Sequence, residues 1–214
     1  MHIPDGFLSP QTFLPLYAVA GAAWALGLRR VRRRLSEETI PLLAVVTALA
    51  FVLNMIALPL PGGTTVHATG IGLLAILFGP WTAFLCLSLV FLMQALLFGN
   101  GGVTALPLAA LAMGLAGSFT AAGLYRLLRA RSETVALFLG AAAAVLVAAA
   151  LVAVVLGIQP LIAQRADGTP LFFPFGLAIT LPAVLLPHLA VAAGEGVLTV
   201  LLYRFLTRLR GVTA

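Results

Sequence analysis

The stretch VALFLGAAAAVLVAAALVAVVL, residues 135–156, has no charged or polar side chain. A helix of about 20 apolar residues crosses a bilayer core about 30 Å thick, so this stretch predicts a transmembrane helix. Similar runs recur along the chain, whose residues are 62% hydrophobic and 8% charged, with a mean hydropathy of +1.15. This balance excludes a soluble globular domain and predicts an all-α membrane protein.

Six further apolar runs are predicted to be membrane segments, which makes a bundle of about seven helices. They lie at residues 11–28, 39–58, 67–79, 81–98, 107–128 and 177–206. The run at 67–79 is short for a spanning helix, so it either begins below the outer surface or is re-entrant. Pro182 and Pro187 predict that the last helix is tilted or broken. We expect residues 1–214 to be one integral membrane domain, with the bundle at 11–210.

The arginines predict the orientation of this bundle. The 12 basic residues are all arginines, and they lie at the ends of apolar runs. Seven segments place all of them except Arg165 on one side, which the positive-inside rule makes cytoplasmic. The N-terminus is then outside and the C-terminus cytoplasmic, in a multi-pass protein of the plasma or inner membrane. The net charge of +6 is therefore a topology signal and does not indicate nucleic-acid binding.

The chain opens with Met-His-Ile-Pro-Asp-Gly, residues 1–6, which predicts a metal chelate. The Met1 amine, the His2 amide nitrogen and the His2 Nδ1 can bind one ion, closing a five-membered and then a six-membered ring. Pro4 and Gly6 stop a helix and turn the segment back. No signal peptide is visible, so we expect residues 1–10 to remain as an extracellular segment. The alternative interpretation is that His2 only lies near a frayed terminus.

His67 is the candidate for a fourth nitrogen ligand. Three nitrogens in one plane and one imidazole make a square-planar site, which is typical of Ni(II) or Cu(II) and unsuited to Zn(II), Mg(II) or Ca(II). Thr64 and Thr65 could bond an imidazole ring and fix its tautomer, or could instead cap the following helix. The alternative for His67 is a bond to a neighbouring carbonyl at the start of that helix.

Four other polar residues lie at membrane depth and are expected to face the bundle interior: Asn54, Gln94, His188 and Glu195. His188 and Glu195 are two helical turns apart on one face. They leave open an intramembrane enzyme, although no convincing catalytic partner is visible. Hydrogen bonds between helices are the simpler interpretation. A stand-alone channel or permease is a third possibility.

The residues quoted above, taken together, resemble a known family, the NikM/CbiM substrate-binding components of nickel/cobalt energy-coupling-factor transporters. The resemblance covers nearly the whole chain. It is carried by residues 1–8, by Gly-Gly-Thr-Thr-Val-His at 62–67, by 94–102, which includes Asn100, and by 187–196. It implies that the Met1 amine, the His2 amide and imidazole, and His67 capture the ion outside the cell. We add Thr64, Thr65 and Asn100 as candidates for the lining of this site.

The resemblance also implies a transporter component and no enzyme or organic cofactor. Such proteins lie in the lipid bilayer with a transmembrane coupling subunit, cytoplasmic ATP-binding-cassette ATPases and often a small accessory membrane subunit. Ala18 and Ala22 fit the small-residue pattern associated with docking to the coupling subunit. The sequence Ile-Pro-Asp-Gly after His2 resembles nickel members more than cobalt members, and the Irving–Williams order also favours Ni(II). Cobalt remains the alternative substrate.

Overall fold

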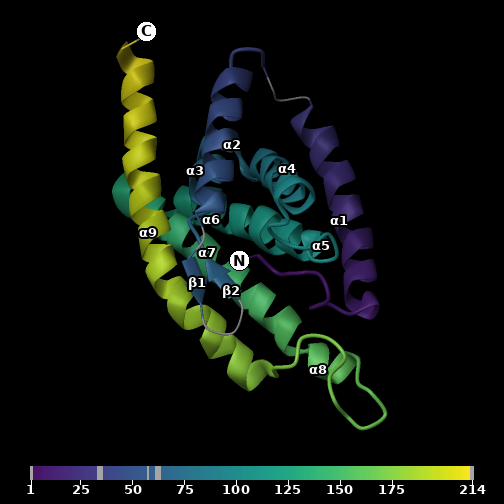
Figure 1. Cartoon of the computed structure of the whole chain (residues 1–214). Helices are drawn as coiled ribbons and strands as arrows, with labels where there is room; N and C mark the ends of the chain where they lie inside the picture. The colour runs from purple at the N-terminus through teal and green to yellow at the C-terminus, as the bar shows by residue number, and fades with distance from the viewer. Residues whose placement is uncertain (1, 33–35, 57, 61–63, 213–214) are drawn as a thin grey trace.

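The structure is a computed structural model that describes residues 2–32, 36–56, 58–60 and 64–212; of residues 58–60, 64–65 and 210–212 it describes the backbone alone. The described residues form seven helical segments and one small hairpin (Figure 1). The segments are α1 (Pro10–Val31), α2 (Ile40–Met55), α3 (Ile71–Phe78), α4 (Pro80–Phe98), the run of α5 (Leu106–Ala109), η1 (Ala110–Gly117) and α6 (Ser118–Leu128), the pair α7 (Glu133–Gly157) and α8 (Gln159–Ile162), and α9 (Leu177–Val212).

The predicted all-α membrane fold of about seven helices is confirmed, with one qualification about length. Within the described residues, five helices are long and apolar enough to cross a membrane: Pro10–Val31, Pro80–Phe98, Leu106–Leu128, Glu133–Ile162 and Leu177–Leu209. The other two helices, α2 with 16 residues and α3 with 8, are shorter. At 1.5 Å per residue, α3 is only about 12 Å long and cannot span the bilayer.

Two predicted boundaries near these short helices were wrong. The helix predicted at 39–58 ends at Met55, because residues 58–60 form strand β1 (Leu58–Leu60), which pairs antiparallel with β2 (Thr64–Val66). The helix predicted at 67–79 begins only at Ile71. Gly70 has φ +72°, which lies outside the right-handed helical region, so the backbone before Ile71 cannot continue the helix. His67 therefore lies in the loop before α3.

The last helix was predicted to be tilted or broken, and of these two alternatives the break is absent. Helix α9 runs without interruption through Pro182 and Pro187. Helices in membranes tolerate proline because neighbouring groups satisfy the freed carbonyls. Figure 1 shows α9 as one long, gently curved helix along one side of the molecule.

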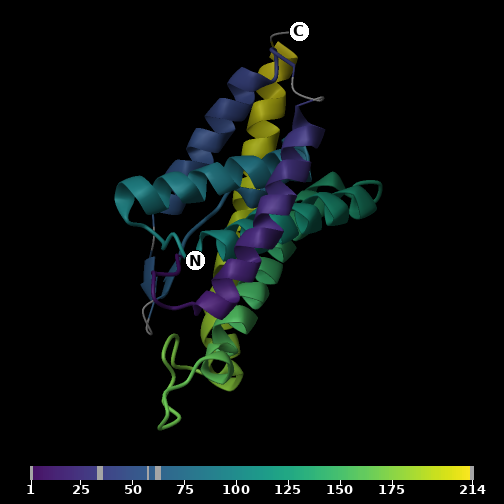
Figure 2. The ribbon, with the colours of Figure 1, turned by 90° about the vertical axis from the view of Figure 1, so that its right-hand side faces the viewer.

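Helix α7 forms the centre of the bundle and packs against α6 and α9. Its buried face is rich in small residues, among them Ala141, Ala144 and Ala148. Small side chains let helix backbones approach closely where no hydrophobic effect drives them together. The short α3 is held among α4, α6 and α7, and its first turns are buried. Figure 2 shows that the C-terminal ends of α1 and α9 lie at the same end of the molecule, while the N-terminal segment is tucked into its middle.

Candidate metal centre

Backbone and carboxylate hydrogen bonds fix the N-terminal segment against the loop after α4. The amide of Gly102 donates to the Ile3 carbonyl at 2.8 Å. The Asp5 carboxylate accepts from the Thr104 amide at 2.8 Å, from the Thr104 hydroxyl and from the Val103 amide at 3.3 Å. The Thr104 hydroxyl bond is the main cause that lowers the pKa of Asp5. The segment that carries His2 is thus anchored at two points and is not a frayed end.

A third anchor follows at the start of α1. The amide of Ser9 donates to the Gln159 Oε1 at 3.0 Å, and Gln159 is fully buried. Its side-chain amide in turn bonds the Thr12 hydroxyl at 3.1 Å and the Val155 carbonyl at 2.8 Å. This glutamine joins the N-terminal segment to the end of the central helix α7.

Gly102 packs so closely against Asp5 that there is no room for a side chain at this position. A Cβ at this position would lie 2.4 Å from Asp5 Oδ1 and 2.5 Å from the Asp5 amide nitrogen. We expect Gly102→Ala to displace the N-terminal segment and to weaken metal binding about tenfold or more, as loss of the groups that orient metal ligands does. Isothermal titration of the purified variant with Ni(II) measures this.

Gly123→Ala is the matched control for that substitution. A Cβ at Gly123, on α6, would meet nothing within 4 Å, so this variant should bind like the parent. Unchanged Ni(II) affinity in Gly102→Ala would contradict the proposed role of the segment, provided that circular dichroism shows the helices of both variants intact.

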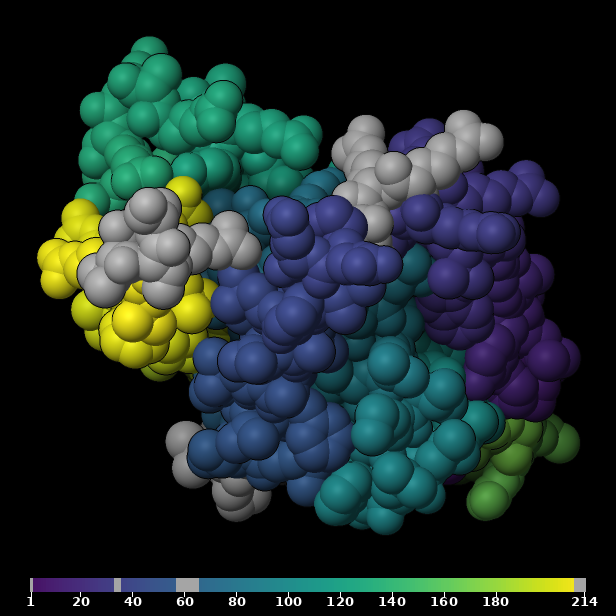
Figure 3. All heavy atoms as spheres, turned by 90° about the horizontal axis from the view of Figure 1, so that it is seen from above, coloured from purple at the N-terminus to yellow at the C-terminus, as the bar shows by residue number. Residues whose placement is uncertain are grey.

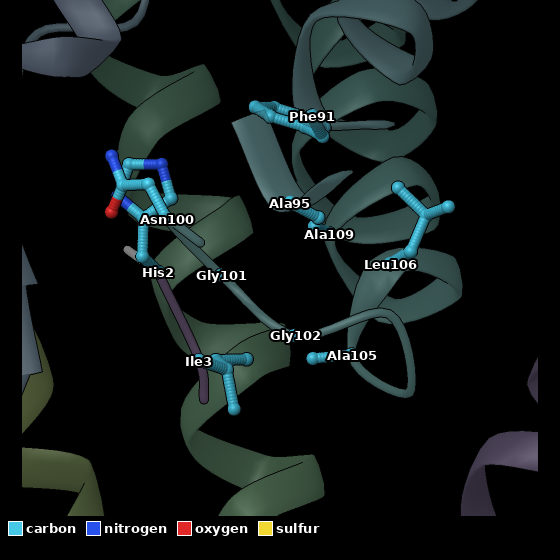
Figure 4. Close-up of a pocket in the computed structure, with 10 residues that line it drawn as sticks. All are labelled: His2, Ile3, Phe91, Ala95, Asn100, Gly101, Gly102, Ala105, Leu106 and Ala109. Atoms are coloured by element: carbon cyan, nitrogen blue, oxygen red, sulfur yellow. The ribbon is translucent and has the colours of Figure 1, made fainter. Parts of the chain in front are cut away.

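The structure brings together the two predicted histidines, which are 65 positions apart. The ring centroids of His2 and His67 are 4.4 Å apart, with the ring planes tilted by 35°. His67 is only 5% exposed, and His2 is half-buried. Figure 4 shows His2 and Ile3 lying alongside the Asn100–Gly102 loop at a small cavity. The sequence-based pairing of His2 with His67 at one place is therefore matched by the geometry.

Gln94 fixes the tautomer of His2. The His2 Nε2 and the Gln94 Oε1 are 3.1 Å apart, and the Gln94 side-chain nitrogen donates to the Phe51 carbonyl at 3.3 Å. Because that amide nitrogen points at Phe51, the oxygen faces His2 and accepts the Nε2 proton. The lone pair then lies on His2 Nδ1, which is buried and has no hydrogen-bond partner among the residues that the structure describes. Burial also lowers the pKa of His2 to about 4, so the ring is neutral at ordinary pH.

His67 is assigned its tautomer in the same manner. Its Nδ1–H donates to the Ala68 carbonyl at 3.2 Å, which places the lone pair on Nε2. The carbonyl bond that was weighed as an alternative role for His67 thus exists. It is compatible with metal binding, because metal-ligating histidines commonly donate a ring N–H to a backbone carbonyl.

Two polar residues of the membrane helices hold the loop that carries His67. The Thr69 amide donates to the Glu195 Oε2 at 2.7 Å, and the Asn54 side-chain amide donates to the Thr69 carbonyl at 3.0 Å. His188 donates from Nδ1 to the Val184 carbonyl at 2.7 Å within α9. These contacts match the interpretation of hydrogen bonds that fix packing.

The remaining candidates are placed less closely or lie outside the described residues. Asn100 lines the small cavity beside His2, and its amide nitrogen lies 3.8 Å from the Met55 sulfur. Met1 is outside the described residues, as are the side chains of Thr64 and Thr65. In the described part of the chain, no three His, Cys, Asp or Glu side chains gather into a metal-binding group. A metal site at the two imidazoles would therefore need further ligands, such as main-chain nitrogens.

Sequence reasoning noted Gln94 but missed its role, and it gave Asp5 none. The signal for Gln94 was the free-energy cost of placing an amide side chain in an apolar membrane helix, because such a side chain must find hydrogen-bond partners. For Asp5 the signal was weaker, because an aspartate in a turn commonly bonds nearby amides. For neither residue does the sequence reveal which group it bonds.

The fold and the site define a class: a multi-pass membrane protein in which a pair of histidines joins an inserted N-terminal segment to the loop before a short helix. The family described as the cobalt uptake substrate-specific transmembrane region, CbiM, matches residues 2–212. The chain belongs to this CbiM/NikM family.

Relatives and a solved structure agree with this assignment. The chain is 42% identical over 212 residues to the probable fused nickel transport protein LarMN of Lactiplantibacillus plantarum, with 97% of the chain and 65% of that protein covered. It is 41% identical over 215 residues to the fused nickel transport protein NikMN of Rhodobacter capsulatus, with 97% and 62% covered. The chain thus spans less than two thirds of the length of these two relatives. The crystal structure of a truncated transition metal transporter is 37% identical, with a TM-score of 0.93 and 97% and 99% of the two chains covered.

Proposed function

We propose that this chain is the metal-capturing S component of an energy-coupling-factor transporter, which imports Ni(II). The proposed ligands are the Met1 amine, the His2 amide nitrogen and Nδ1, and the Nε2 of His67. One observation carries the proposal: the Nδ1 of His2 is buried and has no hydrogen-bond partner within the described part of the chain. Gln94 sets its lone pair, and the His2 ring lies beside that of His67. An imidazole nitrogen buried in this form is prepared for a metal ion.

Nickel is preferred to cobalt on chemical grounds. Four nitrogens in a plane, one of them a deprotonated amide, are strong-field donors that suit low-spin d⁸ Ni(II). The Irving–Williams order also places Ni(II) above Co(II) for nitrogen ligands. The two relatives described above carry nickel in their names, whereas the family description names cobalt. Co(II) uptake is the alternative within the same site.

The chain would work with other subunits in the membrane. The helical bundle is described above, and we infer that ATP-binding-cassette ATPases, a coupling subunit and a small accessory subunit complete the transporter. Ala18 and Ala22 are both exposed on α1 and would contact the coupling subunit. Small residues on an exposed face allow a close helix–helix contact. In this proposal the N-terminus faces outside, where the ion is captured, and the arginine-bearing helix ends face the cytoplasm.

Metal titration of the purified chain with its N-terminus unmodified tests this function. The expected result is a yellow, diamagnetic species with a visible d–d band that saturates at one Ni(II) per chain. Competition with Co(II) then ranks the two metals, with Ni(II) expected to bind more tightly. A paramagnetic, octahedral spectrum would overturn the planar nitrogen site. Tighter binding of Co(II) would overturn nickel as the preferred ion.

The pH dependence of Ni(II) binding is a further prediction, because protons compete for each nitrogen. The His2 ring, with its pKa of about 4, is neutral in this range, and burial lowers the pKa of His67 well below its ordinary value. The terminal amine, with an ordinary pKa of about 7.7–8.0, and the amide must still release protons. The logarithm of the apparent affinity should therefore rise by about two per pH unit from about pH 5.5 to 7, and by about one above about pH 8.5.

Affinities measured against a competing chelator across this pH range check the slope. Imidazoles with the ordinary pKa of about 6.5 would add further protons below about pH 6 and steepen the curve. A slope of about three or four there would contradict neutral imidazoles. A flat response would exclude the amine and the amide from the ligand set.

A further inference from the structure

A hollow at the arginine-bearing end of the bundle takes no part in the proposed capture of metal. It encloses about 1200 Å³ of space, part of it open to solvent, between the end of α1, the α3–α4 turn and α6. Figure 3 looks onto this end of the molecule, where the green α6–α7 region stands apart from the purple end of α1. Residues that matter for its chemistry are Arg29, Arg30, Trp81, Thr82, Phe119 and Arg126.

The hollow gathers positive charge, and its lining, among the described residues, includes no acidic side chain. Arg29, Arg30 and Arg126 come from two helices far apart in the sequence. Guanidinium groups bind phosphate in a bidentate manner and are the side chain that proteins favour for this anion. The charge therefore points to an anionic ligand, and the guanidinium chemistry favours a phosphate.

One wall of the hollow, formed by Trp81 and Phe119, is aromatic and apolar. The Arg30 guanidinium lies over the Trp81 ring, 4.9 Å from its centroid, which holds this cation in place. Trp81 packs edge-on against Phe119 with centroids 5.3 Å apart, and Phe119 is 41% exposed on the outer surface of the bundle. A ligand that fills the hollow would meet cations at one end and exposed apolar surface at the other.

We propose that this hollow binds the phosphate headgroup of an anionic phospholipid. The ligand chemistry fits, because a phospholipid has a phosphate for the arginines and acyl chains for the apolar surface beside Phe119. The position fits as well, since arginines and tryptophan at helix ends lie at the level of lipid headgroups. A soluble phosphate would use only the cationic half of the site, and an acidic peptide would leave the apolar half uncovered. The headgroup would tie the end of α1 to α4 and α6.

Quenching of Trp81 fluorescence by brominated lipid tests this site directly. The chain has two tryptophans, so a Trp24→Phe background leaves Trp81 as the reporter. The full-length protein is reconstituted in phosphatidylcholine vesicles that contain a minor fraction of dibrominated phosphatidylglycerol or of dibrominated phosphatidylcholine. We expect brominated phosphatidylglycerol to quench Trp81 at a lower mole fraction, with a preference of about tenfold or more.

Variants and salt identify the groups responsible. Arg30→Gln and Arg126→Gln should each reduce the preference about fivefold, whereas Arg208→Gln, on exposed α9 away from the hollow, should leave it unchanged. In the protein that keeps all its arginines, high ionic strength should lower the preference for phosphatidylglycerol over phosphatidylcholine. This measurement tests the site even where a variant does not fold.

Three results would overturn the lipid assignment. Equal quenching by the two brominated lipids would leave the hollow without a lipid preference and favour an acidic segment of a partner protein. Loss of quenching on addition of inorganic phosphate would identify a soluble phosphate as the ligand. A preference that survives both arginine substitutions would place the lipid elsewhere.

Discussion

A His67→Ala variant is expected to bind Ni(II) at least about 100-fold more weakly than the parent, since loss of a group that merely orients a ligand costs about 10–100-fold. His67 lies with its ring centroid 4.4 Å from that of His2, and in the proposed site it would supply the fourth nitrogen. With alanine in its place, the N-terminal chelate keeps three nitrogens, and water must take the fourth position. Affinity measured against a competing chelator, together with the visible spectrum, checks this. The d–d band should move to longer wavelength as the ligand field weakens.

His188→Ala is the matched control, because the chain has 3 histidines and His188 is buried like His67. Its Nδ1–H donates to the Val184 carbonyl within its own helix. This substitution removes the same side chain from the bundle, yet it should leave the Ni(II) affinity and the spectrum unchanged. Equal losses in the two variants would mean that the effect comes from disturbed packing. Full binding by His67→Ala would remove His67 from the site.

Most of the fold follows from patterns that the membrane imposes. Long apolar runs bounded by arginines must be helices, because a spanning segment has to satisfy its backbone polar groups internally. The exceptions are the two short helices, α2 and α3. Their ends depend on a hairpin and on Gly70, where the local backbone geometry overrides the hydropathy signal. The prolines in α9 left a break open for a related reason, since a proline lowers helix propensity without deciding whether neighbouring groups can support the helix.

The candidate site could be predicted in part because most of its proposed ligands are neighbouring groups in the first two residues. An amine, an amide and an imidazole in the first two residues form a chelate by bond connectivity alone. The groups that hold this chelate could not be predicted, since they act across long sequence separations. Gln94 sets the His2 tautomer, Gly102 and Asp5 anchor the segment, and Glu195 holds the loop before α3. Each partner is chosen by tertiary packing, which a single sequence does not reveal.

Blocking the terminal amine is expected to have an effect at least as large as loss of His67. A multi-residue extension before Met1 turns the amine into a peptide nitrogen, removes one ligand and places chain where the metal must lie. We expect Ni(II) affinity to fall by at least about 100-fold and the yellow species to disappear. An extension that ends in a protease site directly before Met1 makes the same preparation its own control. Cleavage should restore binding and colour together, and unchanged binding before cleavage would exclude the amine as a ligand.

The effect on Ni(II) binding should depend on the number of residues added before Met1. One added residue places the histidine third from the amine, so that the amine, two amide nitrogens and the imidazole provide four planar nitrogens by themselves. Such a chain should still form a yellow Ni(II) species, and this species should persist when His67→Ala is added. The unextended chain should lose its species on the same substitution. If His67→Ala has the same effect in both backgrounds, His67 does not complete the chelate. A difference between them would show that the fourth nitrogen comes from across the fold only when the N-terminus supplies three.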